Sequence, residues 1–262
     1  MVNLIIDPAK TARQITLFLQ EIREKTGFRH MVIGVSGGVD SAASLFLAVK
    51  AHGADFIHPV LLPFGDLNSE GFKNAESVVQ KAGIKEENVT KIDIINAVES
   101  ITNSDGGMDK LRKGNITARI RMVYLYDLSK KYRALVLGTE NRTEYLLGYF
   151  TRFGDEASDI EPLQHLYKTE VGQLVEYLDI PRTIIEQKPT AGLWEGQTDE
   201  GEFGFTYKEA DCILNFYVDL KKTKKEILKF GFKQKTVERV LTRLTANSFK
   251  HRLPYILSRN NL

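Results

Sequence analysis

Residues 30–41 read His30-Met31-Val32-Ile33-Gly34-Val35-Ser36-Gly37-Gly38-Val39-Asp40-Ser41, an apolar run followed by two adjacent glycines and a polar segment. The apolar part predicts a buried strand at 31–35, and the residues after it predict a helix at 41–52. Gly37 and Gly38 can adopt positive φ angles and bring the backbone close to a ligand, while the helix turns its free N–H groups toward that ligand. The stretch therefore predicts a phosphate site. The alternative is a plain glycine turn capped by Ser36 and Ser41.

Strands and helices alternate along the rest of the chain. Apolar patterns predict helices at 8–26, 69–82, 115–131, 168–178 and 207–220, and strands at 56–62, 89–94 and 134–137. Repeated strand–helix units indicate the α/β class: a doubly wound parallel sheet flanked by helices, with ligands at the carboxyl ends of the strands. Ser36 and Thr139 stand at two such ends. The length favours a single domain over residues 1–262.

Polar residues also gather after the strand predicted at 134–137. If Asn141 opens a short helix, Glu144 falls in its first turn and can face the same cleft as Asp40. The two carboxylates would then share Mg²⁺, a hard cation that prefers oxygen ligands and the phosphates of ATP. The alternative for Glu144 is a charge that complements the helix dipole.

Composition limits the other functions open to the chain. The 36 basic and 34 acidic residues nearly cancel, so we expect no nucleic-acid partner. The single cysteine, Cys212, excludes a disulfide framework and a multi-cysteine metal site within one chain, and the five histidines lack ligand spacing. No apolar run approaches 18 residues and the N-terminus does not read as a signal peptide, so we expect a cytoplasmic protein without a membrane partner.

The stretch 188–205 mixes glycines, acids and aromatic residues and is too long for an ordinary connection. We interpret it as a lid that closes over a reactive intermediate and excludes water. Trp194 within it would report closure by its fluorescence. The alternative is a surface loop without a catalytic role. The following residues, 206–258, are predicted as a helical C-terminal part of the same domain.

Several segments, taken in order, resemble the ammonia-dependent NAD synthetases. The loop at 36–41 resembles the pyrophosphate loop of the wider superfamily of N-type ATP pyrophosphatases, which cleave ATP between the α and β phosphates. The further matching segments are 114–122 (GNITARIRM), 137–139 with Glu144, 148–155 (GYFTRFGD), 159–163 (DIEPL), 167–171 (YKTEV), 189–191 (PTA) and 193–200 (LWEGQTDE). The resemblance covers most of the chain and implies the Rossmann-like fold of the adenine nucleotide alpha hydrolases.

The resemblance implies a two-step ligation. The carboxylate of nicotinic acid adenine dinucleotide (deamido-NAD) attacks the α-phosphorus of ATP and pyrophosphate departs; ammonia then displaces AMP from the adenylated dinucleotide to give NAD. ATP is then a co-substrate and Mg²⁺ the cofactor. Positioned donors and a metal ion stabilise charge on phosphoryl oxygens with little covalent chemistry by the protein. This agrees with the lack of a recognisable Ser-His-Asp or Cys-His set in the sequence.

The resemblance also implies residue roles, carried over position by position. The residues expected at the ATP site are Gly34, Val35, Ser36, Gly37, Gly38, Val39, Asp40, Ser41, Thr139, Lys168 and Thr190. The residues expected on Mg²⁺ are Asp40 and Glu144. The residues expected to contact deamido-NAD are Arg119, Arg152, Asp159 and Lys250. The residues expected to be catalytic are Asp40, Lys168 and Asp155. A carboxylate at Asp155 could take a proton from incoming ammonium.

Three positions depart from the family pattern. The family commonly shows Asp-Gly-Gly-Ala-Asp where this chain has Asp155-Glu156-Ala157-Ser158-Asp159. Gly192 stands where Asp is usual, and Phe249 precedes Lys250 where His is frequent. These departures indicate either divergence within the family or a different acid substrate.

Free ammonia is the expected nitrogen donor, because glutamine-using relatives carry an additional amidase domain for which 262 residues leave no room. The family also implies a homodimer, with the helix at 115–131 as a candidate contact. Two alternatives stay open. One is a related ATP-dependent ligase that acts on a different acid. The other is an ATP-binding module without catalysis, whose basic C-terminal part contacts nucleic acid through phosphates.

Overall fold

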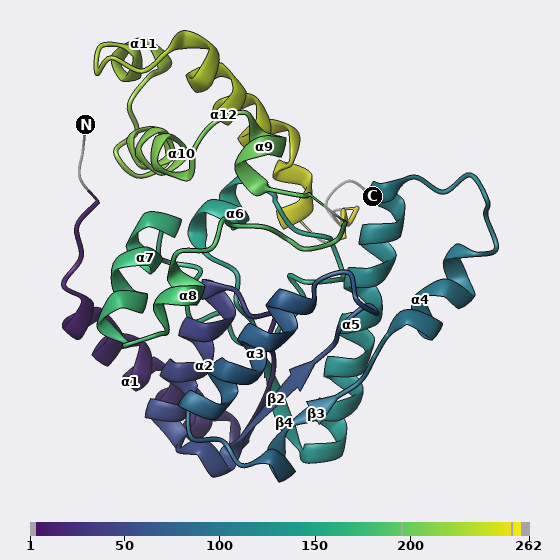
Figure 1. Ribbon diagram of the computed structural model, residues 1–262. Coiled ribbons are helices and arrows are strands. Elements are labelled where there is room, and N and C mark those ends of the chain that lie inside the picture. Colours follow the sequence, from purple (N-terminus) through teal and green to yellow (C-terminus); the bar gives the residue numbers. More distant parts are fainter. Residues whose placement is uncertain (1–3, 195, 253, 258–262) are drawn as a thin grey trace.

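The computed structural model describes residues 4–194, 196–252 and 254–257, and it is built on one parallel sheet (Figure 1). The strands are β1 (His30–Gly34), β2 (Ile57–Leu61), β3 (Thr90–Lys91) and β4 (Ala134–Leu137). Their order across the sheet is β3-β2-β1-β4, and every pairing is parallel. The chain moves outward from β1 to β3 and then returns to the other side of β1 with β4. Such a reversal leaves a crevice at the carboxyl ends of β1 and β4, where ligands bind in this fold class.

Helices cover both faces of the sheet, which confirms the doubly wound prediction. Alternate strand residues point to opposite faces: Met31 and Ile33 lie in the apolar cluster of one face, and Val32 lies in that of the other. The helices of the first face are α1 (Pro8–Thr26), α2 (Val39–His52), α3 (Ser69–Lys81) and α7 (Lys168–Tyr177). The helices of the second face are α4 (Ile95–Thr102) and α5 (Lys110–Tyr132).

A third apolar cluster gathers the C-terminal helices beyond the sheet, at the top of Figure 1. Its elements are α6 (Arg142–Leu147), α9 (Asp199–Phe203), α10 (Tyr207–Leu214), a π-helical turn (Asn215–Asp219), α11 (Lys224–Leu228) and α12 (Gln234–Ala246). The short helix α8 (Arg182–Ile185) packs against α7, and a 3₁₀ turn (Ser248–His251) follows α12. Because α10 contacts both α6 and α7, this cluster joins the sheet domain next to the crevice.

The bounds of α1 and β4 are those predicted, and those of β1, α2, β2, α3 and α7 differ from the prediction by one or two residues. Three further elements differ by more. The helix α5 begins five residues before the predicted start because the Asp109 carboxylate caps it, accepting from Arg112 N at 2.8 Å. The edge strand β3 keeps only two residues. The helix predicted at 207–220 changes at Leu214 from α-helical to π-helical hydrogen bonding.

The stretch predicted as a lid has two parts. Residues 188–194 form no helix or strand, whereas Asp199, Phe203 and Phe205 are buried in and beside α9. A closing movement stays a prediction, and the packing limits it to the first part. Residue Glu195, and residues 253 and 258 of the predicted C-terminal part, lie outside the described residues. Within the described ranges, no helix has the length and apolar character needed to cross a bilayer.

Candidate active site

The turn between β1 and α2 has the backbone geometry that phosphate binding needs. Gly37 has a φ of +85°, in the left-handed region that favours glycine. A Cβ built on Gly37 would lie 2.1 Å from the carbonyl oxygen of Gly71 in α3, so packing also requires glycine. Gly38 directly precedes α2, which therefore begins at Val39 and presents its first N–H groups to the crevice.

Two serine side chains hold this turn in place. Ser41 Oγ donates to the Gly38 carbonyl at 3.0 Å and lies 3.1 Å from Ser36 Oγ. Ser36 Oγ in turn accepts from Gly38 N at 3.3 Å. The serines thus fix the conformation of the turn, which lowers the cost of ordering it around a phosphate.

Three charged side chains from distant parts of the chain meet beside this turn. Lys168 Nζ forms an ion pair with Asp40 Oδ2 and lies 3.3 Å from Glu144 Oε1. The Lys168 side chain is 10% exposed, and those of Asp40 and Glu144 are 16% and 17% exposed. The two carboxylates that the sequence places on Mg²⁺ are therefore brought together, with the lysine predicted at the ATP site between them.

Hydrogen bonds at two helix starts fix this arrangement. Asn141 Oδ1 accepts from Glu144 N at 3.0 Å, and Asn141 Nδ2 donates to Asp40 Oδ1 at 3.0 Å. The prediction that Asn141 opens a short helix with Glu144 in its first turn is confirmed. Lys168 is the first residue of α7, and its backbone N–H donates to Thr143 Oγ1 at 2.9 Å. A cation is unfavourable at a helix start, and here the two carboxylates offset that effect.

Burial and mutual charge set the protonation of this group. Burial raises the pKa of Glu144 to about 8, with Lys168 opposing the rise and Asp40 adding to it. Burial lowers the pKa of Lys168, but Asp40 and Glu144 outweigh it and raise that pKa above its ordinary value. Lys168 therefore stays charged at neutral pH and offers a fixed positive charge to phosphoryl oxygens.

The donor set fits Mg²⁺ held jointly with a nucleotide. Asp40 and Glu144 supply hard carboxylate oxygens, and Mg²⁺ is commonly bound by one or two carboxylates, with phosphates and water completing its octahedron. Among the described residues, no three His, Cys, Asp or Glu side chains are placed to hold a metal ion. A magnesium ion here would therefore depend on substrate phosphates.

A buried acid behind Lys168 is absent from the predicted site residues. Asp199 is 3% exposed and accepts from Tyr207 Oη at 2.8 Å and from Tyr149 Oη at 3.0 Å. The Tyr207 ring centre lies 5.2 Å from Lys168 Nζ. Since Asp199 begins α9, this network ties the second part of the lid stretch to the charged centre. The matching segment 193–200 contains Asp199, but nothing in its spacing points to Lys168.

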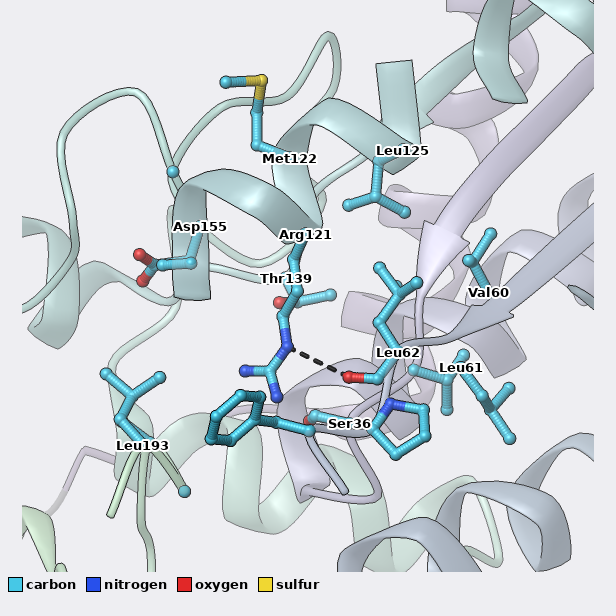
Figure 2. A pocket seen from close by; sticks show the side chains of 18 of the residues that line it. Ser36, Val60, Leu61, Leu62, Arg121, Met122, Leu125, Thr139, Asp155 and Leu193 are labelled. Carbon is cyan, nitrogen blue, oxygen red and sulfur yellow. Dashed lines mark hydrogen bonds between the residues drawn. The ribbon is translucent and has the colours of Figure 1, made fainter. Parts of the chain in front are cut away.

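A cavity of about 240 Å³ opens between α5 and the ends of β1, β2 and β4 (Figure 2). Its walls are mostly apolar, and the polar side chains in them include Ser36, Arg121, Thr139 and Asp155. Such a composition suits a flat ring held by a few directed polar groups. Of the predicted ATP-site residues, Gly34, Val35, Ser36 and Thr139 line the cavity. Thr190 is exposed and accepts from Gly192 N at 3.1 Å, while its neighbours 191–193 line the cavity.

Arg121 is the cavity residue that sequence reasoning missed. Its Nε donates to the Leu62 carbonyl at 3.2 Å, and Figure 2 shows its guanidinium between Leu62 and Leu193. The α5 residues that line the cavity are Ala118, Arg121, Met122 and Leu125. Their spacing of i, i+3, i+4 and i+7 marks one helix face. That spacing is the sequence signal from which Arg121 could have been predicted as a cavity residue.

The chain matches a known protein family over most of its length. The family model described as NAD synthase matches residues 11–254. The chain belongs to the NAD synthase family. Within this family it is similar to the NH(3)-dependent NAD(+) synthetase of Fusobacterium nucleatum, being 39% identical over 256 residues that cover 98% of each chain.

Two solved structures from the NAD synthase group have the same fold over nearly the whole chain. The NH3-dependent NAD synthetase of Campylobacter jejuni superposes with a TM-score of 0.81 at 27% identity, covering 97% of this chain and 100% of that one. The NMN synthetase of Francisella tularensis superposes with a TM-score of 0.84 at 32% identity, with the same coverage. The expected adenine nucleotide alpha hydrolase-like fold is thereby confirmed.

Three of the four residues that the NAD synthase resemblance assigns to the acid substrate gather along 148–153. Arg119 Nε and Nη2 donate to the Arg152 carbonyl at 3.2 and 3.1 Å. Lys250 Nζ donates to the carbonyls of Gly148 and Phe150, both at 2.7 Å. Three cations therefore lie near the cavity wall at Gly154, and their contact with a substrate stays a prediction.

The fourth of these residues, Asp159, extends the edge of β4. Its Oδ2 accepts from Val136 N at 2.8 Å, and its own N–H donates to the Val136 carbonyl at 2.9 Å. Asp155 instead lies in the cavity wall, where its Oδ1 accepts from Thr151 N at 2.8 Å. Burial raises the pKa of Asp155, which makes this carboxylate a better proton acceptor.

Proposed function

We propose that the chain is a ligase that uses ATP and free ammonia to convert deamido-NAD into NAD, releasing AMP and pyrophosphate. The observation that carries the proposal is the meeting of Lys168 with Asp40 and Glu144 beside the glycine turn. One fixed cation, two carboxylates and a helix start are the parts that a metal-bound triphosphate requires. Membership of the NAD synthase family and the names of its curated relatives support the same reaction.

In the first step a carboxylate oxygen of the substrate forms a bond to the α-phosphorus of ATP. The bond from that phosphorus to the bridging oxygen breaks, and pyrophosphate leaves with its electron pair. Backbone N–H groups at the start of α2 orient the phosphates, and Lys168 neutralises the charge that develops on them. Mg²⁺ held by Asp40 and Glu144 would add Lewis-acid neutralisation. Arg121 and Thr139, which both line the cavity, would orient the adenosine part there.

In the second step ammonia attacks the acyl carbon, AMP leaves with the electrons of the broken C–O bond, and the attacking nitrogen releases one proton to solvent. Ammonium must first lose a proton, because its nitrogen has no free lone pair. Asp155, a carboxylate in the cavity wall whose pKa is raised by desolvation, is suited to accept that proton. Residues 191–193 cover one side of the cavity and would shield the adenylate from hydrolysis.

The acid-binding side and the assembly are proposed on the family resemblance. Arg119, Arg152 and Lys250 supply positive charge that suits the phosphates of a dinucleotide. A homodimer through α5 is supported by its exposed apolar residues Leu111 and Val123, which are 62% and 54% exposed. A cytoplasmic location completes the proposal.

A second candidate acceptor is nicotinic acid mononucleotide, which would yield NMN by the same two steps. The likeness to the Francisella tularensis NMN synthetase favours it. Both acceptors use the same ATP site and differ only in the acid.

The test is to incubate the full chain with Mg-ATP and ammonium chloride and to offer each acid separately. Pyrophosphate release and the mass of the product are measured. We expect NAD from deamido-NAD, lost in Asp40→Asn and kept in Asp55→Asn, whose carboxylate forms an exposed pair with Lys85. NMN formed in preference to NAD would replace the first acceptor with the second. Absence of pyrophosphate release with both acids would overturn the ligase proposal.

A further inference from the structure

Two glutamates, the buried Glu140 and the partly buried Glu161, lie directly behind the cavity wall. Glu161 packs against Gly138, where a Cβ would stand only 1.8 Å from Glu161 Oε1, and Gly138 lines the cavity. Glu161 Oε2 accepts from the Glu140 backbone N–H at 3.0 Å. Glu161 Oε1 accepts from Ser158 Oγ at 2.6 Å. The two acids form one unit with the wall, and the steps proposed above use neither of them.

One carboxyl oxygen of this unit has no hydrogen-bond partner. Glu140 is 7% exposed, and its Oε2 accepts from Gln164 Nε2 at 2.8 Å. Its Oε1 is buried without a partner among the described residues. Leaving a buried polar atom unpaired is costly, so such an atom in a folded protein calls for an explanation, such as an ion, a ligand or water.

The charges around Glu140 are of the wrong sign to compensate it. Glu161 and Asp155 both disfavour its ionised form. Within the described chain, no basic side chain forms an ion pair with these three acids. Lys250 acts on Glu140 electrostatically but donates to backbone carbonyls. The wall therefore carries one buried acid, Glu140, beside two further acids, and an added cation can neutralise this group.

We propose that Glu140 and Glu161 form a docking site for ammonium, the nitrogen substrate of the proposed reaction, behind the wall that holds Asp155. The identity of the ligand rests on the proposed function. Ammonium suits the site because its N–H groups donate to carboxylate oxygens at ordinary hydrogen-bond distances. The described acids are not placed as a divalent metal would need them. The site would hold the ammonium nitrogen close to Asp155, the carboxylate proposed to accept its proton.

The departure of this chain from the family pattern contributes to the site. Ser158 stands where the family commonly has alanine, and its hydroxyl holds Glu161. Burial raises the pKa of Glu140 to about 9 and that of Glu161 to about 7. A cation bound between them would favour their ionised forms. Docking of ammonium is therefore expected to release a proton from the pair near neutral pH.

The substitution Glu140→Gln tests the site because it removes the charge and keeps the side-chain shape. We expect the KM for ammonium to rise about 10-fold or more, with the KM for ATP changed by less than about 2-fold. The matched control is Glu76→Gln on α3, which removes a carboxylate that is paired with Lys91 of β3. An unchanged KM for ammonium in Glu140→Gln would overturn the proposal. If that variant fails to fold, Glu161→Gln takes its place with the same expectation.

Direct binding is measured without catalysis from the line width of ¹⁵N-ammonium. Broadening by the wild-type protein and Glu76→Gln, but not by Glu140→Gln, supports the site. Equal line widths with all three proteins overturn it, even if the chain makes NAD. If the wild-type protein binds ammonium through Glu140 and forms neither NAD nor NMN, the proposed function fails while the cation site stands.

Discussion

Lys168 and Asp40 are 128 residues apart in the sequence, yet their side chains form an ion pair at the carboxyl edge of the sheet. The glycine turn carries Asp40 there, and Thr143 holds the backbone of Lys168. Glu144 completes the group from α6. One cation thus compensates two carboxylates that are largely removed from water, so its loss affects folding as well as phosphate binding.

Lys168→Met keeps the side-chain length and removes this charge. Breaking a buried ion pair typically costs about 3–5 kcal/mol, and protonation of Glu144 relieves part of that, so we expect the free energy of unfolding to fall by about 2–3 kcal/mol at pH 7. Product formation should fall about 100-fold or more, as for the loss of one stabilising donor in an active site. Urea unfolding and initial rates measure the two effects.

The control for this variant is Lys81→Met, which breaks the pair with Asp179, whose side chain is 91% exposed. Pairs at the surface contribute about 0–1 kcal/mol, so the control should unfold like the wild-type protein. Equal stability losses in the two variants would contradict the role of Lys168 as the compensating charge.

The meeting of Asp40, Glu144 and Lys168 could largely be predicted from the sequence, whereas Glu140 could not. Parallel strands end at one edge, and Asn141 marks a helix start, so both carboxylates follow from local patterns. Glu140 directly follows Thr139 and reads as a surface acid, because acids are rarely buried. Its burial results from the return of residues 158–164 over β4, a tertiary packing that no local pattern encodes.

Arg121 and Arg119 should separate ATP binding from acid binding. Arg121 donates to Leu62 inside the cavity, whereas Arg119 lies on the exposed side near Arg152. Replacing Arg121 with Leu should raise the KM for ATP about 10-fold or more, the loss expected for a charged hydrogen-bond donor. Arg119→Leu should leave the KM for ATP within about 2-fold and raise the KM for the acid. Steady-state kinetics with each substrate varied in turn decides this, and the reverse pattern would exchange the two roles.

The helical pattern of α5 does not predict which of Arg119 and Arg121 faces the cavity. Residues two apart on an α-helix point about 200° apart, so Arg119 and Arg121 cannot both face the crevice. The apolar stripe includes Ile116 and Ile120, which pack on the sheet, and does not show which flank borders the cavity. The flank that borders the cavity is decided by how α5 lies across the strand ends, which is a matter of tertiary packing.

The stability of the protein should depend on pH through Glu140. Burial raises its pKa in the folded state to about 9, above the ordinary 4.5. Between these values the folded protein binds a proton that the unfolded chain lacks, so this group makes stability fall as pH rises. From pH 7 to 8.5 the wild-type protein should lose about 2 kcal/mol more than Glu140→Gln, at about 1.4 kcal/mol per pH unit.

This pH effect is measured by urea unfolding of both proteins in metal-free and ammonium-free buffers across that range. Glu161, Asp155 and Glu144 also act on Glu140, and they are present in both proteins, so the difference between the two slopes isolates Glu140. Ammonium chloride at pH 8 should then stabilise the wild-type protein more than the variant, since a ligand stabilises the state that binds it. Parallel slopes would show that Glu140 is not a protonated buried acid.

The contact of α5 with the first part of the lid can be tested at Gly114. A Cβ added there would lie 3.1 Å from Leu193 Cδ1 and 3.4 Å from the Trp194 ring. Gly114→Ala should therefore push back a segment that lines the cavity and weaken ATP binding about 3- to 10-fold. Trp194 is the only tryptophan in the sequence, so its fluorescence during a Mg-ATP titration gives the affinity and reports the lid directly.

Gly172→Ala on α7 is the matched control, because a Cβ there meets nothing within 4 Å. Alanine is favoured over glycine inside a helix by about 1 kcal/mol, so the control should unfold at higher urea and bind ATP like the wild-type protein. Gly114→Ala gains the same helix preference, and a weaker ATP affinity without a loss of stability would then be due to the crowded lid. Identical ATP titrations for the two alanine variants would show that ATP binding does not depend on the close contact of Gly114 with residues 193–194.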